Sequence, residues 1–184
     1  MDQILDNRRN GKVGEAIKEA IKPGSRLSFI SSCFTIFAFD KLKEELARCE
    51  QLRFLFIEPA FIKSNPKETR EYYIRRTNRE KNLSGNEFEL KLKNELTQSS
   101  IAKECAEWLK NKAELKSLKS SAVEPIKLYH IENDDHQIAI QGNSDFTAEG
   151  LGFTYSPRMN VNTLSRNPET TRELLTFFNE VWSD

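Results

Sequence analysis

Apolar residues recur at two different spacings along the chain, and the changes between them predict an order of helices and strands. Residues 11–24 carry apolar side chains at helical intervals and end in Pro-Gly, which predicts a helix that stops there. Residues 25–35 alternate with little charge, as in a strand buried on both faces. A period near 3.6 returns over residues 39–49, and residues 51–59 again have strand character until Pro59 ends it. This order predicts adjacent parallel strands joined by a right-handed crossover.

The composition changes between residue 61 and about residue 120. This segment is polar and charged, and its apolar residues follow a helical period over residues 86–96 and 101–115. Turn residues precede each of these two stretches. We therefore expect a helical insertion at about 61–120 between two strands of the sheet.

Strand patterns resume at residues 123–132 and 136–142, and the turn Asn-Asp-Asp joins them. Residues 167–182 form an apolar stripe behind an Asn-Pro start, which predicts a closing helix. The 184 residues are expected to form a single α/β domain with a mixed central sheet flanked by helices on both faces. Four strands are expected in that sheet, at residues 27–33, 52–57, 126–131 and 137–141.

Composition places limits on partners and on the cellular compartment. The chain has 28 basic and 28 acidic residues, so its formal net charge of zero excludes a uniformly basic nucleic-acid binder, and any attraction to phosphate must be local. The three cysteines lie far apart, without a metal-binding or disulfide spacing. No apolar run is long enough for a signal peptide or a membrane span. A cytoplasmic protein without a membrane partner is expected.

Residues 125–151 have the pattern of a strand, a turn, a second strand and a further turn that begins at Gly142 with the sequence Gly-x-Ser-x-Phe-Thr. This segment resembles the phospholipase D-like superfamily, whose signature is His-x-Lys-x4-Asp followed by Gly-Ser-x-Asn. Residues 64–112, which begin SNPKETREYYIRRTNREK, are similar to the N-terminal phospholipase D-like domain of bacterial superfamily-2 helicases of the Swi/Snf type. The resemblance implies a mixed α/β fold, a helicase motor domain in the same protein, and a role in DNA restriction or phage defence.

Most positions of the signature are altered in this chain. The six corresponding residues are Pro125, Lys127, Glu132, Gly142, Asn143 and Asp145. In the family, the histidine attacks phosphorus and the lysine and asparagine hold the non-bridging oxygens. Pro125 has no nucleophile, and Asp145 places a negative charge where the family has a donor. The resemblance therefore implies a vestigial site without catalytic residues.

Several of these residues allow a second interpretation. Lys127 is either a retained contact for an anion, or a solvated strand lysine or salt-bridge partner of Glu132 or Asp145. The residues after Gly142 are either remnants of the signature or turn residues that satisfy backbone groups. An active nuclease would need another nucleophile, such as His130 or His136. His130 is five residues from Pro125, so a regular strand turns it to the opposite face.

Residues 63–81 are the most basic part of the chain. They hold seven basic and three acidic residues, with two tyrosines between them. Such a composition supplies phosphate contacts and a stacking surface, but it is equally typical of an exposed helix with internal ion pairs. The candidate nucleic-acid contacts are Lys127, Arg70, Arg75, Arg76 and Arg79.

The leading hypothesis is a phospholipase D-like domain without hydrolytic activity that engages DNA weakly or assists assembly of a helicase system. An active phosphodiesterase with an altered residue set and a protein-binding adaptor are the alternatives. Family members with one signature pair two copies to complete a site, so a homodimer around Lys127 and Gly142 is expected. We expect no cofactor. A metal site is not expected either, because the acidic residues and His136 of the hairpin turn are simplest to explain as solvated.

Overall fold

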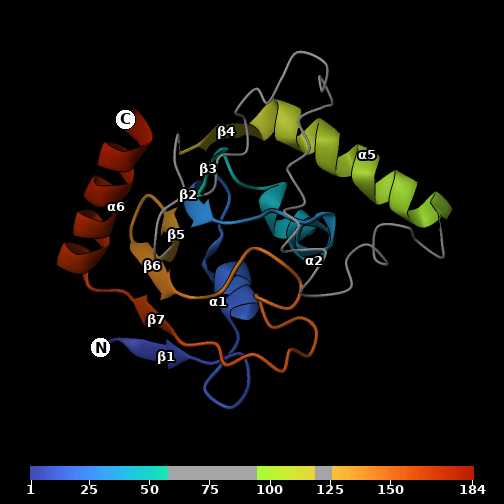
Figure 1. The fold of residues 1–184 in the computed structure, drawn as a ribbon. Helices are drawn as coiled ribbons and strands as arrows, with labels where there is room; N and C mark the ends of the chain where they lie inside the picture. The colour runs from blue at the N-terminus through green and yellow to red at the C-terminus, as the bar shows by residue number, and fades with distance from the viewer. Residues whose placement is uncertain (58–94, 119–125) are drawn as a thin grey trace.

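A computed structural model describes residues 1–57, 95–118 and 126–184 of the chain. These residues form one mixed seven-stranded sheet with four helices, and the strand order is β1-β7-β6-β5-β2-β3-β4 (Figure 1). The strands are β1 Gln3–Leu5, β2 Arg26–Ser31, β3 Gln51–Phe56, β4 Ala113–Ser117, β5 Lys127–Glu132, β6 Gln137–Gly142 and β7 Asn162–Ser165. The helices are α1 Val13–Ala20, α2 Ile36–Leu46, α5 Glu95–Lys112 and α6 Pro168–Ser183.

The strand–helix–strand unit lies at the centre of the sheet. β2 and β3 are parallel neighbours, with Phe29 opposite Phe54, and α2 connects them. α2 begins where Thr35 accepts a hydrogen bond from the Ala38 amide at 3.1 Å, as a side-chain cap does. The prediction of two adjacent parallel strands is therefore confirmed.

The predicted hairpin joins this unit on the other side of β2. β5 is antiparallel to both β2 and β6, and the amide of Asn133 donates to the carbonyl of His136 across the turn at 2.9 Å. All four predicted strands thus lie in one sheet, and the α/β class with a mixed sheet is confirmed.

Side chains alternate between two cores on either side of the sheet. The larger core contains Phe29, Phe54 and Tyr129 and packs against α1, α2 and α5. The smaller core contains Leu128 and Ala139 and packs against α6. In Figure 1, α6 stands on one side of the sheet and α1, α2 and α5 on the other. α6 starts as predicted, because Asn167 caps the helix and a proline follows it.

The prediction for residues 61–120 needs correction at its C-terminal end. The helix ends at Lys112, and β4 runs parallel to β3 at the edge of the sheet with Leu115 opposite Phe54. In β4 the half-buried Leu115 lies between the exposed Glu114 and Lys116, which is strand alternation. Pairing with β3 overrides the helical propensity of the sequence AELK. The predicted helix at 86–96 lies mostly outside the described residues.

All three cysteines are buried, and Cys49 and Cys105 belong to the larger core. Burial raises the pKa of the Cys49 thiol to about 11 and that of Cys105 to about 12, so these two thiols are protonated and unreactive at neutral pH. None of the described helices is long and apolar enough to cross a membrane.

Candidate functional site

The candidate site begins where the two strands of the hairpin meet at Lys127 and Gly142. These two residues are directly opposite each other in the register of β5 and β6. Gly142 lies against β7, and a Cβ there would be 2.3 Å from the Val161 carbonyl oxygen and 2.4 Å from Asn162 Oδ1. A glycine is therefore required at this position for the close approach of β7.

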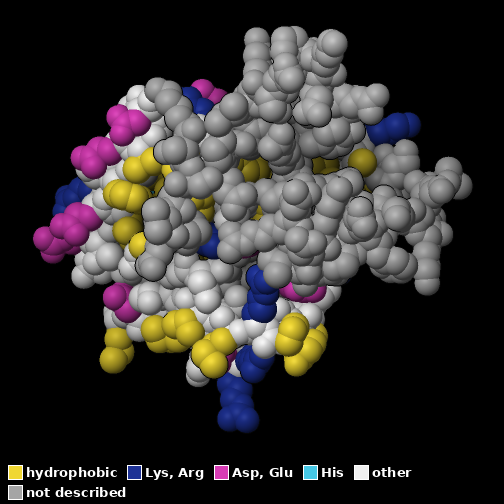
Figure 2. Space-filling view, viewed as in Figure 1, with side chains coloured by type: hydrophobic (Ala, Val, Ile, Leu, Met, Phe, Trp, Pro, Cys, Tyr) yellow, Lys and Arg dark blue, Asp and Glu magenta, His cyan; other side chains and the backbone are white. Residues whose placement is uncertain are grey.

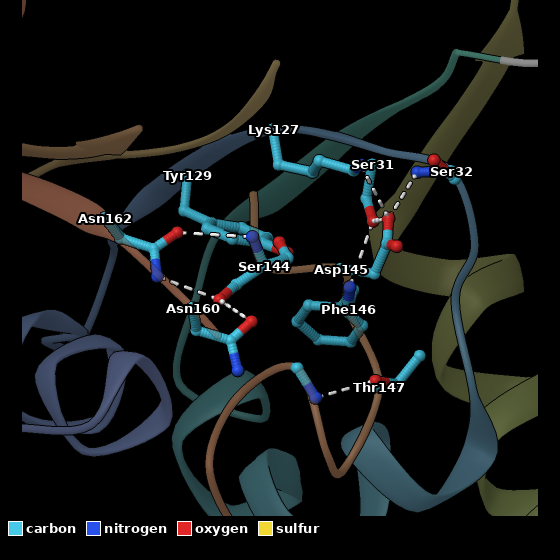
Figure 3. A network of polar contacts seen from close by, with 11 residues as sticks. Ser31, Ser32, Lys127, Tyr129, Ser144, Asp145, Phe146, Thr147, Asn160 and Asn162 are labelled. Carbon is cyan, nitrogen blue, oxygen red and sulfur yellow. Dashed lines mark hydrogen bonds and ion pairs between the residues drawn. The ribbon is translucent and has the colours of Figure 1, made fainter. Parts of the chain in front are cut away.

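Lys127 forms an ion pair with Asp145. Its Nζ is 3.8 Å from Asp145 Oδ1, and the side chains are 7% and 19% exposed (Figure 3). The same carboxylate oxygen accepts hydrogen bonds from the Ser31 hydroxyl and the Ser32 amide, both at 3.1 Å. Three donors from β5 and from the end of β2 thus converge on one carboxylate oxygen. Of the two interpretations of Lys127, the structure supports the salt bridge, with Asp145 as the partner.

Glu132 lies at the other end of β5 and takes no part in this site. Its carboxylate forms a salt bridge of 3.1 Å with Arg26, the residue opposite it in β2. The position that corresponds to the signature aspartate is therefore separated from Lys127 by the length of the strand.

The position of Asp145 is fixed by the residue that follows it. Phe146 is fully buried, and its ring stacks on that of Phe34 with centroids 4.9 Å apart. The Phe146 amide donates to Ser31 Oγ at 2.9 Å, and the Thr35 amide donates to the Phe146 carbonyl at 3.2 Å. Burial of Phe146 thus holds the Asp145 carboxylate beside the end of β2.

Ser144 is the centre of a buried polar network on the other side of the corner. Its hydroxyl donates to Asn160 Oδ1 at 3.3 Å and accepts from Asn162 Nδ2 at 2.8 Å, while its amide donates to Asn162 Oδ1 at 3.2 Å (Figure 3). The Tyr129 hydroxyl donates to its carbonyl at 2.6 Å. Burial, assisted by the nearby Asp145 charge, raises the pKa of Tyr129 well above its usual value. Tyr129 therefore remains a neutral donor in this network.

Asn143 holds the backbone of the loop that precedes β7. Its Nδ2 donates to the Met159 carbonyl at 3.0 Å, and its Oδ1 accepts from the Val161 amide at 2.9 Å. Together with the Ser144 network, these contacts agree with the interpretation of the residues after Gly142 as turn residues that satisfy polar groups.

Both histidines lie away from Lys127. His130 is fully buried on the α6 face of β5, the face opposite to that of Tyr129, as strand parity predicts. Burial lowers its pKa, so the ring is neutral at pH 7. His136 lies in the exposed turn at the far end of the hairpin, where its Nδ1 is 2.6 Å from Asp135 Oδ1.

The other proposed site residues lie outside the described residues. They are Pro125, Arg70, Arg75, Arg76 and Arg79. Within the described ranges, no three His, Cys, Asp or Glu side chains are grouped closely enough to hold a metal ion.

The sequence did not predict Ser31 and Ser32 as partners of Asp145. Ser31 and Ser32 are more than 100 residues from Asp145 in sequence. A signal was present in the Ser-Ser pair at the end of a largely buried strand, and in the alternating asparagines at 160 and 162. Polar residues in buried segments require hydrogen-bond partners, so such residues indicate contacts with other parts of the chain.

Neither a protein-family model nor a curated protein matches the sequence. Among solved structures, the chain is similar to TrmBL2, an archaeal chromatin protein whose structure shows a novel mode of DNA binding. The two are 13% identical with a TM-score of 0.48, and the match covers 99% of this chain and 52% of that protein. This chain thus spans about half the length of TrmBL2. A match at this level identifies neither a fold family nor a function.

Proposed function

We propose that this chain is a phospholipase D-like domain that has lost hydrolytic activity and engages DNA in a bacterial helicase system of restriction or phage defence. The observation that carries the loss of activity is the convergence of Lys127 Nζ, Ser31 Oγ and the Ser32 amide on the Asp145 carboxylate. The family assignment itself is supported by the sequence resemblance and by the position of Lys127 opposite Gly142.

In this proposal, Asp145 is an internal substitute for a bound phosphate. Lysine and neutral donors are the groups that hold the non-bridging oxygens of a phosphodiester. Here these donors are already satisfied by a carboxylate on the same chain. An entering phosphate would have to displace that carboxylate and would be repelled by it. We therefore expect no cleavage at this corner.

Neither histidine of the chain is suitably placed to serve as the nucleophile of the active-nuclease alternative. His130 is buried beneath α6 and His136 is at the opposite end of the hairpin. Neither ring reaches a phosphate that Lys127 contacts without rearrangement of the strand.

Contacts with DNA phosphates therefore have to come from basic residues other than Lys127. Lys127 is buried and paired, so it is a poor phosphate contact in this arrangement. The arginines of the 63–81 segment remain the proposed contacts, and the zero net charge implies weak affinity for the isolated domain. We also propose that residues 1–184 precede a helicase motor in the same protein and that the domain forms a homodimer.

Two assays on the 184-residue chain test this proposal. The first measures cleavage of labelled DNA and of a simple phosphodiester, with and without divalent metal, and we expect none. The second measures retention of labelled DNA as salt is increased, and we expect binding that weakens with salt. Cleavage that disappears in Lys127→Ala would establish the nuclease instead. Absence of both cleavage and DNA retention would favour the adaptor.

A further inference from the structure

Two loops adjoin on the surface next to the candidate site. Residues 6–12 connect β1 to α1, and residues 152–161 lead into β7. The Arg8 guanidinium donates to the Ser156 carbonyl at 3.4 Å, and Asn7 Nδ2 donates to the Gly150 carbonyl at 2.8 Å. These contacts place the exposed side chains of both loops on one surface. We define this arginine–tyrosine surface by Arg8, Arg9, Tyr155, Arg158 and Met159.

The backbone beneath this surface is held in a fixed conformation. Asn7 has a φ of 59°, and its Oδ1 accepts a hydrogen bond from the Val13 amide at 2.9 Å. Gly152 has a φ of 81°, and a Cβ there would be 2.8 Å from Asn7 Oδ1. The Asn143 side chain, next to Gly142, forms hydrogen bonds with the backbone of residues 159 and 161 in the second loop. The turn after β6 therefore supports this surface. The exposed side chains therefore project from a preorganised support.

Two large side chains of this surface, Tyr155 and Met159, are mostly exposed to solvent. Tyr155 is 82% exposed and Met159 is 80% exposed, whereas Ser156 and Asn160 between and beside them are buried. Figure 2 shows hydrophobic and basic side chains next to one another over β1 and the adjoining loops at the lower edge of the molecule. Exposed aromatic and apolar groups gathered on a rigid support are typical of a binding surface.

The charge of the surface is positive although the chain is neutral overall. Residues 6–12 and 152–161 contain Arg8, Arg9, Lys12 and Arg158 against one carboxylate, Asp6, a local net charge of about +3. The Asp6 carboxylate accepts hydrogen bonds from the backbone amides of residues 8 and 10 and from the Asn10 side chain, each at 2.9 Å. It is thus directed into its own loop and away from a ligand.

We propose that the arginine–tyrosine surface binds single-stranded nucleic acid. The arginines contact phosphates and the Tyr155 ring stacks on a base, the combination by which single strands are bound without sequence preference. A duplex buries its bases and offers no stacking partner to Tyr155, so the single strand fits this surface better. The proposal rests on the proposed DNA engagement and adds the strand type and a second set of contact residues.

The test uses the 184-residue chain, a fluorescein-labelled oligothymidylate and a duplex of equal length, with anisotropy read over a salt series. Arg9→Ala with Arg158→Ala is expected to weaken binding and to reduce the magnitude of the salt slope by about 1.4, or about 0.7 for each lost phosphate contact. Tyr155→Ala is expected to weaken single-strand binding about fivefold or more and duplex binding less, whereas Tyr155→Phe retains it. Arg172→Ala, an exposed arginine on α6, is the matched control.

The outcomes separate this proposal from the general proposal of DNA binding. If the surface variants bind like the parent while replacing Arg75, Arg76 and Arg79 abolishes binding, the surface is refuted and DNA engagement stands. Loss in the surface variants with unchanged thermal midpoints supports the surface. If Tyr155→Ala weakens duplex and single strand equally, the stacking role is wrong. If the parent binds neither oligonucleotide, both proposals fail.

Discussion

The Lys127 ammonium group and the Asp145 carboxylate form a largely buried ion pair that joins the start of β5 to the corner after β6. The pair lies where the sequence resemblance places a phosphate-binding lysine and an asparagine. A lysine withdrawn from water requires a counter-charge, and Asp145 supplies it from within the chain. The charge of Lys127 is thus satisfied by a structural contact within the chain.

The first prediction concerns the stability of this pair. Lys127→Met leaves the carboxylate without its cation, and Asp145→Asn leaves the ammonium group without its anion, so each should lower the free energy of unfolding by about 1–3 kcal/mol. The double variant should lose less than the sum of the two, because no unpaired charge remains. Urea denaturation of all four proteins measures this coupling. Additive losses would show that the two groups do not interact.

The second prediction concerns the close approach at Gly142. In Gly142→Ala the added methyl group meets the Val161 carbonyl and Asn162, both in or next to β7. Because backbone has to shift, we expect a loss of about 1–3 kcal/mol in the free energy of unfolding. Gln141→Ala, one residue earlier in the same strand and half-exposed, is the control and should change stability little. Equal stabilities of the two variants would contradict the packing of β7 described above.

The third prediction is a pH dependence that arises from His130. Burial lowers the pKa of the His130 ring in the folded chain, whereas an unfolded histidine has a pKa of about 6.5. Below that pH the unfolded chain takes up a proton that the folded chain does not, so the stability present at higher pH is lost as the pH falls. The loss continues until the pH reaches the lowered pKa of the folded state.

Urea denaturation at pH 7.5 and pH 5.5 tests this dependence. His130→Gln should lose less stability between the two pH values than the parent does, although it is expected to be less stable at pH 7.5. His136→Gln removes the other histidine, which is exposed in the turn, and should retain the parent's dependence on His130. If His130→Gln and the parent lose the same amount, the buried ring is not the origin.

Sequence patterns predicted the central elements because these elements are determined by local periodicity. In β2, α2 and β3 apolar residues recur at the spacing of a strand or a helix, and strand parity placed His130 correctly on the face opposite to Tyr129. β4 was predicted as helix because Ala, Glu, Leu and Lys favour helices, and its strand form depends on pairing with β3. β1 and β7, with three and four residues, are too short to produce a periodic signal.

The candidate site was predictable in its residues but not in its contacts. Lys127, Gly142 and Asp145 follow from the spacing of the resemblance, yet the partners at the end of β2 do not. Ser31 is 114 residues from Asp145 in sequence, and this contact arises because β5 places the hairpin beside β2. Contacts of this kind depend on strand order, which local periodicity does not determine.

The last prediction is a gain of anion binding when the internal carboxylate is neutralised. In Asp145→Asn, Lys127 Nζ and the donors of Ser31 and Ser32 no longer meet a negative charge, and the 19% exposure of Asp145 leaves the corner accessible from solvent. Inorganic phosphate should therefore bind the variant and raise its thermal midpoint with concentration, since a ligand that binds the folded state stabilises it. The parent should respond less, and adding Lys127→Met should abolish the gain, which separates a specific site from a general salt effect. Sodium chloride at equal ionic strength is the control for screening.

The variant should still not cleave DNA, because neutralising one carboxylate supplies no nucleophile. An unchanged phosphate response in Asp145→Asn would mean that the donors around Asp145 do not form an anion site, and that the resemblance at this corner is one of sequence alone.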